Sequence, residues 1–231
     1  MKHIRLSILA LALMAIVPMM GQSKQVMLET SKGRILLTLF DDTPQHRDNF
    51  LKLVNEQFYD SLLFHRVIKN FMIQGGDPDS RHAEPGVTLG EGSVDYTIEG
   101  EFFDSEGHLL HPHRRGALAM AREGDNVNPE RRSSGCQFYI VWGRTYASTQ
   151  LEKIGEKLEE KTDHRVTMTP ELMDLYRKTG GSPHLDGQYT VFGEVTEGLD
   201  VVDSIQQSLT DDYDRPIDDI RILKAQVISQ P

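Results

Sequence analysis

Short apolar runs separated by polar turns recur along most of the chain, and this pattern predicts strands. Residues 26–30 and 35–40 form the first pair, and the Lys32-Gly33 dipeptide between them suits a tight hairpin. The stretch 64–77 is expected to form a strand that ends in a Gly-Gly-Asp turn. The same pattern predicts further strands at 116–121, 136–142, 189–195 and 220–228, with short pieces at 87–89 and 96–98.

Few segments space their apolar residues for a helix. Thr43 offers an N-cap with Pro44 at the first helical position, and the apolar stripe that begins at Phe50 predicts a helix over 44–58. A second helix is predicted over 197–207. Because the predicted strands do not alternate with helices, the pattern favours an antiparallel closed sheet over a doubly wound one.

Residues 143–182 differ in character from the segments on either side. They are charged, and their apolar residues predict two amphipathic helices, over 150–161 and 170–178. The chain has 231 residues, which suits one domain with such an elaboration. We therefore predict a single domain over 24–231 that contains the helical segment.

The first 23 residues have the pattern of a secretory signal peptide. Lys2 and Arg5 precede an apolar run that is too short to span a bilayer comfortably. Small residues favour cleavage after Ser23, and cleavage nearer Gly21 is an equal alternative. An uncleaved anchor is the other interpretation, which the short run disfavours. We expect an exported protein with no stable membrane insertion after signal removal.

The net charge argues against a nucleic-acid partner, and the spacing of histidines argues against a metal site. The formal net charge of −10 repels phosphate backbones, so nucleic acid is not an expected partner. Cys136 is the single cysteine, so no internal disulfide can form, and we expect it to be buried and structural. The cluster of His108, His111 and His113 matches no standard zinc spacing and is expected to lie in a loop. We predict neither a metal site nor a cofactor.

The stretch 64–77 is the strongest candidate for a functional site. It places Arg66 within a few residues of two large apolar side chains, Phe71 and Met72, and of the amide of Gln74. A fixed cation beside apolar side chains must stay paired or hydrated, which makes the arrangement costly in an ordinary strand. An ordinary surface ion pair is the alternative explanation for Arg66.

Four ordered blocks along the chain carry a family resemblance. They are 64–66 with 71–77, then 116–121, 134–140 and 184–193. Across 26–228 the chain resembles the cyclophilin-type peptidyl-prolyl cis-trans isomerases. The resemblance implies a mostly β fold, an eight-stranded antiparallel β-barrel capped by two helices, to which 143–182 is a helical insertion.

The resemblance also implies a function and a set of site residues. The activity would be acceleration of rotation about X–Pro bonds in proline-containing polypeptides, which assists folding. Arg66 is the implied catalytic residue and favours the twisted amide. The implied proline pocket consists of Phe71, Met72, Tyr139 and Leu185. Positions implied to grip the substrate are Gln74, Ala121, Arg122 and Gln137, with His184 and Tyr189 beside them. On periodicity alone, Phe71, Tyr139 and Leu185 fit a barrel core at least as well.

Catalysis of rotation about an X–Pro bond requires few chemical groups. Rotation about an X–Pro bond faces a barrier of roughly 18–20 kcal/mol because amide resonance is lost. Catalysis needs an apolar pocket for the ring and a donor that favours the twisted amide, with no nucleophile, metal or cofactor. A non-catalytic peptide-binding or chaperone module that uses 143–182 is the alternative function. A metal-dependent hydrolase lacks a coherent ligand set.

The chain departs from the family pattern at a few positions. His184 replaces the tryptophan of well-studied eukaryotic members, so cyclosporin binding is expected to be weak, and His184 is expected to titrate near neutral pH. Tyr189 stands where many members have histidine. The 143–182 insertion is expected near the mouth of the site, as a lid, a partner surface, a dimer contact or a stabilising excursion. Family habit favours a periplasmic location.

Overall fold

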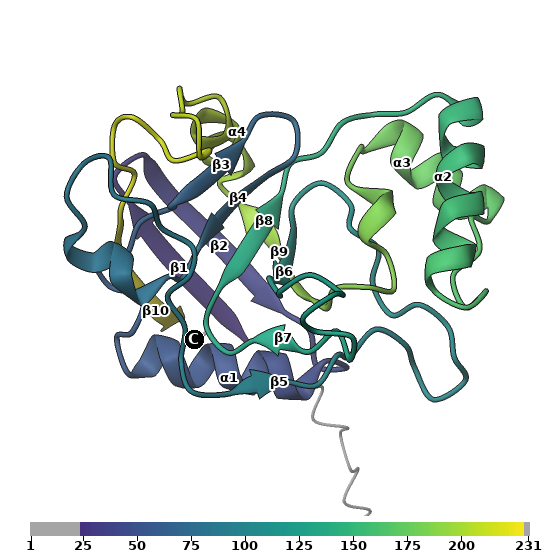
Figure 1. The fold of residues 1–231 in the computed structure, drawn as a ribbon, viewed down its shortest axis with the longest axis horizontal. Coiled ribbons are helices and arrows are strands. Elements are labelled where there is room, and N and C mark those ends of the chain that lie inside the picture. The colour runs from purple at the N-terminus through teal and green to yellow at the C-terminus, as the bar shows by residue number, and fades with distance from the viewer. Residues whose placement is uncertain (1–23, 229–231) are drawn as a thin grey trace, which may run out of the picture.

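The computed structural model describes residues 24–228 (Figure 1). The predicted signal peptide over 1–23 lies outside the described residues.

One antiparallel sheet of eight strands forms the body of the protein. Its order is β10-β1-β2-β9-β6-β8-β4-β3, and every pairing is antiparallel. The two edges approach each other, because Phe64 N–H donates to Ile220 O (2.8 Å) and Ile222 N–H donates to Leu62 O (2.8 Å). The predicted eight-stranded antiparallel sheet is confirmed. The strands are β1 (Gln25–Thr30), β2 (Gly33–Leu39), β3 (Arg66–Ile68), β4 (Met72–Gly75), β6 (Ala117–Met120), β8 (Phe138–Val141), β9 (Val191–Glu197) and β10 (Ile222–Ile228).

Two helices cover the two open ends of the curled sheet. Helix α1 (Pro44–Asn55) lies at the lower end in Figure 1, and α4 (Leu199–Gln206) lies at the upper end. Proline at the start of α1 has no N–H to leave unsatisfied there, which fixes where the helix begins. The helix predicted over 44–58 therefore starts as expected and ends three residues earlier, at Asn55.

The sheet separates two apolar clusters. Alternate residues of β1 and β2 point into the main core, where Phe50, Tyr59, Phe138 and Phe192 pack edge to face or tilted. Cys136 belongs to this core and is fully buried, as expected, and burial raises the pKa of its thiol. A second, smaller cluster includes Tyr139, whose neighbour Phe138 belongs to the main core. Neighbouring residues of a strand point to opposite faces, so the smaller cluster lies outside the barrel.

Some local predictions were wrong. Residues 64–77 form a hairpin of β3 and β4 rather than one strand, because Asn70 adopts a left-handed turn conformation (φ 60°) that asparagine tolerates. Residues 87–89 form no strand. Residues 97–98 do pair, as β5 (Thr97–Ile98), with β7 (Ser133–Ser134).

The 143–182 insertion contains the two predicted helices and lies to one side of the sheet (Figure 1). Helix α3 (Pro170–Lys178) has the predicted bounds, and α2 (Ser148–Lys161) begins two residues early. The two ends of the insertion meet, since Arg144 and Gly181 exchange backbone hydrogen bonds of 3.2 and 3.0 Å. A Cβ atom on Gly181 (φ 146°) would lie 2.3 Å from His113 O.

Replacement of Gly181 by alanine is expected to destabilise the protein by about 3 kcal/mol or more, because the backbone conformation and the contact both exclude a side chain. Gly107→Ala is the matched control: its φ is 88°, but a Cβ there would meet nothing within 4 Å. The control should lose only about 1 kcal/mol. Urea unfolding of both variants measures the difference, and equal losses would contradict the close contact.

Candidate active site

A row of directly paired residues crosses the outer face of the sheet. Arg66 on β3 pairs with Gln74 on β4, Gln74 pairs with Tyr139 on β8, and Tyr139 pairs with Ala119 on β6. Opposed residues of neighbouring strands share a face. Strand register therefore brings the guanidinium, the amide and the phenol to one side of the sheet, outside the main core.

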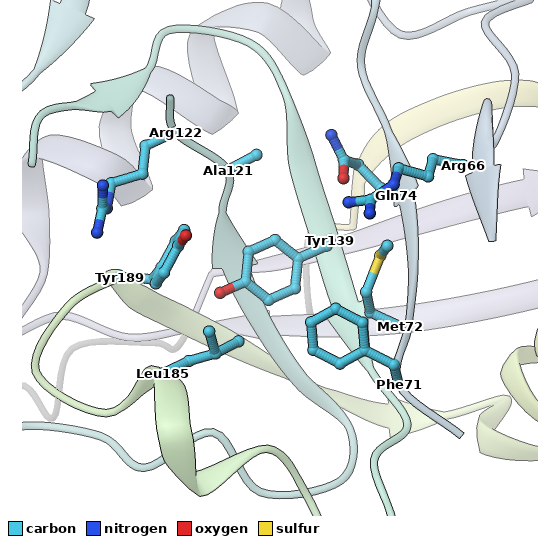
Figure 2. A pocket seen from close by; sticks show the side chains of 9 residues that line it. All are labelled: Arg66, Phe71, Met72, Gln74, Ala121, Arg122, Tyr139, Leu185 and Tyr189. Carbon is cyan, nitrogen blue, oxygen red and sulfur yellow. The ribbon is translucent and has the colours of Figure 1, made fainter. Parts of the chain in front are cut away.

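A cavity of about 220 Å³ lies on this row (Figure 2). In Figure 2, Arg66, Gln74 and Met72 form one side, Arg122 and Tyr189 form the other, and Tyr139 lies between them. The lining contains nine of the eleven residues that the sequence singled out: Arg66, Phe71, Met72, Gln74, Ala121, Arg122, Tyr139, Leu185 and Tyr189. Their roles toward a substrate stay predictions.

The other two predicted residues lie next to this cavity. Gln137 lines an adjoining cavity, which shares Gln74, Ala121 and Arg122 with the first. His184 is exposed, and its ring lies beside Phe71, with the two ring centroids 5.7 Å apart. The structure thus places both beside the pocket without adding them to its lining.

Arg66 has one ion-pair partner among the described residues, Asp214. The Arg66 Nε–Asp214 Oδ2 distance is 3.3 Å, and the two side chains are 44% and 41% exposed. A pair this exposed contributes only about 0–1 kcal/mol. The predicted alternative of a surface ion pair is therefore present, but Arg66 also lines the pocket, where its planar donors stay close to any bound group.

A chain of amides orients Gln74. The Gln137 amide nitrogen donates to Gly90 O (2.8 Å) and Gly92 O (2.7 Å). The Gln137 amide oxygen then accepts from Gln74 Nε2 at 2.9 Å. Two backbone carbonyls thereby fix which way both side chains face, because a carbonyl oxygen can only accept.

A buried polar network supports Tyr139 from behind. The Tyr139 hydroxyl oxygen, Oη, lies 3.0 Å from His113 Nε2, and His113 Nδ1 lies 2.9 Å from Asp186 Oδ1. Because a carboxylate accepts, Nδ1 carries a proton, and Nε2 shares a hydrogen bond with the Tyr139 hydroxyl. Tyr176 of the insertion donates to Asp186 Oδ2 at 2.7 Å. His113, Asp186 and Tyr176 are fully buried, and burial raises the pKa of both tyrosines well above its ordinary value.

Sequence reasoning missed this network. The prediction that the histidine cluster lies in a loop is confirmed, since His108, His111 and His113 all lie outside helices and strands, but His113 is fully buried whereas His108 is exposed. Asp186 is 73 residues away from His113, so no local spacing signals their contact. The one available signal was the place of Asp186 inside the fourth block of the family resemblance.

Arg122 closes the far wall of the pocket with its side chain. Its guanidinium carbon lies 4.4 Å from the centre of the Tyr189 ring, a cation–π arrangement. Arg122 also donates to Gln188 O (2.9 Å) and pairs with Asp125 (2.7 Å). These contacts hold Tyr189 edge-on to Tyr139, with ring centres 6.1 Å apart.

Two histidines near the site have perturbed pKa values. Partial burial lowers the pKa of His184, and nearby basic groups add to the effect while Asp186 opposes it, so its pKa lies below its ordinary value. His65, the residue before Arg66, is 2% exposed, and its ring lies beside Gly90. Burial, aided by Arg66 and Arg215 and opposed by Asp77, lowers the pKa of His65 to about 4.

The insertion contributes none of the nine residues that line the pocket. Its helix α2 packs instead against the short 3-10 helix η2 (Pro183–Leu185), which carries Leu185. Among the roles open to the insertion, this position favours a stabilising one over a lid. No helix among residues 24–228 is long and apolar enough to cross a membrane.

Comparison with known proteins identifies relatives across the described chain. Residues 25–227 match the family model of cyclophilin type peptidyl-prolyl cis-trans isomerases. A putative peptidyl-prolyl cis-trans isomerase of Staphylococcus saprophyticus is 31% identical over 209 residues, which cover 90% of this chain and 93% of the relative. A putative bifunctional phosphatase/peptidyl-prolyl cis-trans isomerase of Streptococcus pyogenes is 36% identical, and the match covers 86% of this chain but only 37% of that protein.

Solved structures agree with the sequence comparisons. A crystal structure of a cyclophilin type peptidyl-prolyl cis-trans isomerase of Cryptosporidium parvum superimposes with a TM-score of 0.64 at 25% identity, covering 91% of this chain and all of that one. A second crystal structure of that protein, in the presence of the dipeptide Ala-Pro, gives a TM-score of 0.60 and covers 89% and 99% of the two chains.

The lowered pKa of His65 predicts a pH-dependent stability. Between pH 6.5 and about 4 the unfolded chain binds a proton at this residue that the folded chain does not, so stability falls as the pH falls. The His65 contribution lost across this range is about 3 kcal/mol. His65→Gln should lose less stability than the wild type between pH 7 and pH 4 in urea unfolding. His108→Gln, at an exposed site, is the control, and an unchanged pH dependence in His65→Gln would refute the assignment.

Proposed function

The chain belongs to the cyclophilin-type peptidyl-prolyl cis-trans isomerases, and from this we propose that the cavity beside Tyr139 receives the prolyl ring while Arg66 promotes rotation of the preceding amide. The observation that carries the proposal is the position of Arg66 at one side of a small, largely aromatic and aliphatic pocket. The crystal structure of the Cryptosporidium parvum relative in the presence of Ala-Pro supports a proline-containing peptide as the substrate class.

The proposed mechanism is electrostatic and involves no covalent step. As the X–Pro amide twists, resonance is lost and the prolyl nitrogen regains a localised lone pair. A guanidinium directed at this nitrogen stabilises the twisted amide more than either planar isomer, which is the condition for catalysis. Gln74, oriented by Gln137, can hold the adjacent backbone in place. Because the Arg66–Asp214 pair is exposed and weak, the Arg66 guanidinium remains available to a bound amide.

The pocket floor is proposed to depend on the insertion. Tyr176 of α3 donates to Asp186, and Asp186 holds His113 against the Tyr139 hydroxyl. Such a fully satisfied buried network fixes one arrangement of its members, because each broken bond leaves a buried polar group unpaired. The 143–182 insertion then acts as a support for the Tyr139 ring.

Two further parts of the proposal rest on the sequence. His184 in place of tryptophan supports weak cyclosporin binding, because imidazole is smaller than indole and is already packed on Phe71. The basic and apolar pattern of residues 1–23 supports export, with the periplasm as the proposed site where the enzyme assists folding of envelope or secreted proteins.

The first test removes the proposed catalytic group. Arg66→Ala should lower kcat/KM for an X–Pro tetrapeptide roughly 100- to 1,000-fold, as expected for loss of a positioned electrostatic group. Stability should change by only about 0–1 kcal/mol, because the pair with Asp214 is exposed. A protease-linked isomerase assay measures the rate. Arg34→Ala is the control, since Arg34 also forms an exposed pair, with Glu29 at 3.3 Å. A folded Arg66→Ala protein with wild-type activity would contradict the assignment of Arg66 as the catalytic residue.

A second test addresses the insertion. Tyr176→Phe leaves Asp186 Oδ2 without the hydroxyl that donates to it, which should cost about 1–3 kcal/mol of stability and lower kcat/KM by loosening Tyr139. Tyr146→Phe is the matched control, because Tyr146 belongs to the same insertion but donates only to Gly181 O, at 3.3 Å. Tyr146→Phe should leave kcat/KM unchanged. Equal kinetic effects of the two variants would argue against a specific link through Asp186.

A further inference from the structure

Exposed large apolar side chains gather at one place on the described surface. Seven such residues are exposed among residues 24–228, and four of them lie in two adjacent loops. Single exposed apolar residues are ordinary, but a group of them marks an interaction site. We call this group the Tyr213 surface: Val87 (48% exposed), Leu209 (79%), Tyr213 (70%) and Ile217 (65%).

The Tyr213 surface is held rigidly. Arg215, only 4% exposed, donates to Glu84 O (3.0 Å) and Val87 O (2.7 Å) and so ties the two loops together. Its charge is balanced by Asp219, at 2.9 Å. Ile217 N–H donates to Leu209 O across a bridge, which places these two side chains opposite each other on one face. Exposed apolar groups on a fixed frame lose little entropy when they bind a partner.

A hollow separates the two loops. Its volume is about 450 Å³, and Pro85, Gly86, Pro216 and Ile217 supply its apolar walls. Asp211 and Asp218 lie at the same hollow in addition to Asp219, which pairs with Arg215, so its apolar walls have an acidic rim. Such a surface suits an apolar side chain whose neighbours are uncharged or basic.

This surface is continuous with the active site. Asp214, next to Tyr213, accepts from Val67 N–H at 2.8 Å and pairs with Arg66 at 3.3 Å. In Figure 1 the yellow chain that follows α4 lies beside β3, the strand that begins with Arg66. A polypeptide that leaves the pocket past Arg66 therefore reaches the Tyr213 surface directly.

We propose that the Tyr213 surface binds the part of an unfolded polypeptide substrate that extends out of the pocket past Arg66, with a preference for apolar and basic residues there. This inference rests on the proposed function of the pocket. A second copy of the chain fits less well, because a two-fold contact through this surface would bring its acidic rim against itself. An anionic membrane would meet the same repulsion.

The test compares a short substrate with a long one. The variant Leu209→Ser/Tyr213→Ser/Ile217→Ser should keep the wild-type kcat/KM for an X–Pro tetrapeptide, which is too short to reach beyond the pocket. It should bind a fluorescently labelled, unstructured peptide of about 20 residues, in which apolar and basic residues flank one X–Pro bond on both sides, roughly tenfold more weakly in fluorescence anisotropy. Leu223→Ser is the control, because Leu223 is 54% exposed on β10 and is outside the group.

The outcomes separate the alternatives. Unchanged binding by the triple variant would overturn the proposal, and so would an equal loss of tetrapeptide activity, which would show damage to the pocket. Leu209→Ser alone, with one substitution at an exposed site, guards against misfolding and should show a smaller loss of binding. A wild-type dimer that the triple variant dissociates in sedimentation velocity would assign the surface to a second copy. A wild type without tetrapeptide activity would refute the proposed function, whereas the binding comparison would still decide the role of the surface.

Discussion

The carboxylate of Asp186 is the constraint on which the site depends most. It is fully buried, and it accepts from the backbone N–H of His113 (2.8 Å), from the ring of His113 and from the hydroxyl of Tyr176. A buried carboxylate without these donors would be strongly destabilising, so the three groups must stay where they are. Through His113 the same requirement reaches the hydroxyl of Tyr139 and hence the floor of the pocket.

The division of the sheet into two faces explains how a small barrel can hold a rigid core and an open site together. Phe138 packs into the aromatic core while the next residue, Tyr139, points outward into the pocket. The rigid inner face holds the strand register, and register alone aligns Arg66, Gln74 and Tyr139 on the outer face. Arg66 stands at an edge strand, where water and the weak pair with Asp214 can accommodate its charge.

The small size of the cavity limits what it can recognise by itself. A volume of about 220 Å³ suits one ring, so affinity for a longer chain has to come from surfaces around the cavity. The insertion supports the cavity from behind and leaves the mouth free, whereas the loop of Asp214 borders the mouth beside Arg66. The segment that supports the cavity is thus different from the segment that borders its mouth.

Local patterns in the sequence determined the parts of this structure that depend on neighbouring residues. Thr169 and Pro170 set the start of α3, which has the predicted bounds, because a cap and a fixed φ act within one turn. The ordered blocks identified the family, and nine of the eleven residues chosen through them line one cavity. The alternation of apolar and polar residues predicted the strands of an antiparallel sheet.

Only the tertiary structure decided what depends on distant partners. The turn at Asn70 was hidden inside an apolar run, so one expected strand is a hairpin. Asp186, 73 residues after His113, binds the buried His113 ring, Tyr176 of the insertion donates to Asp186, and partial burial lowers the pKa of His184. Periodicity describes which side chains share a face, but which distant groups meet depends on chain closure and strand order, which no local pattern contains.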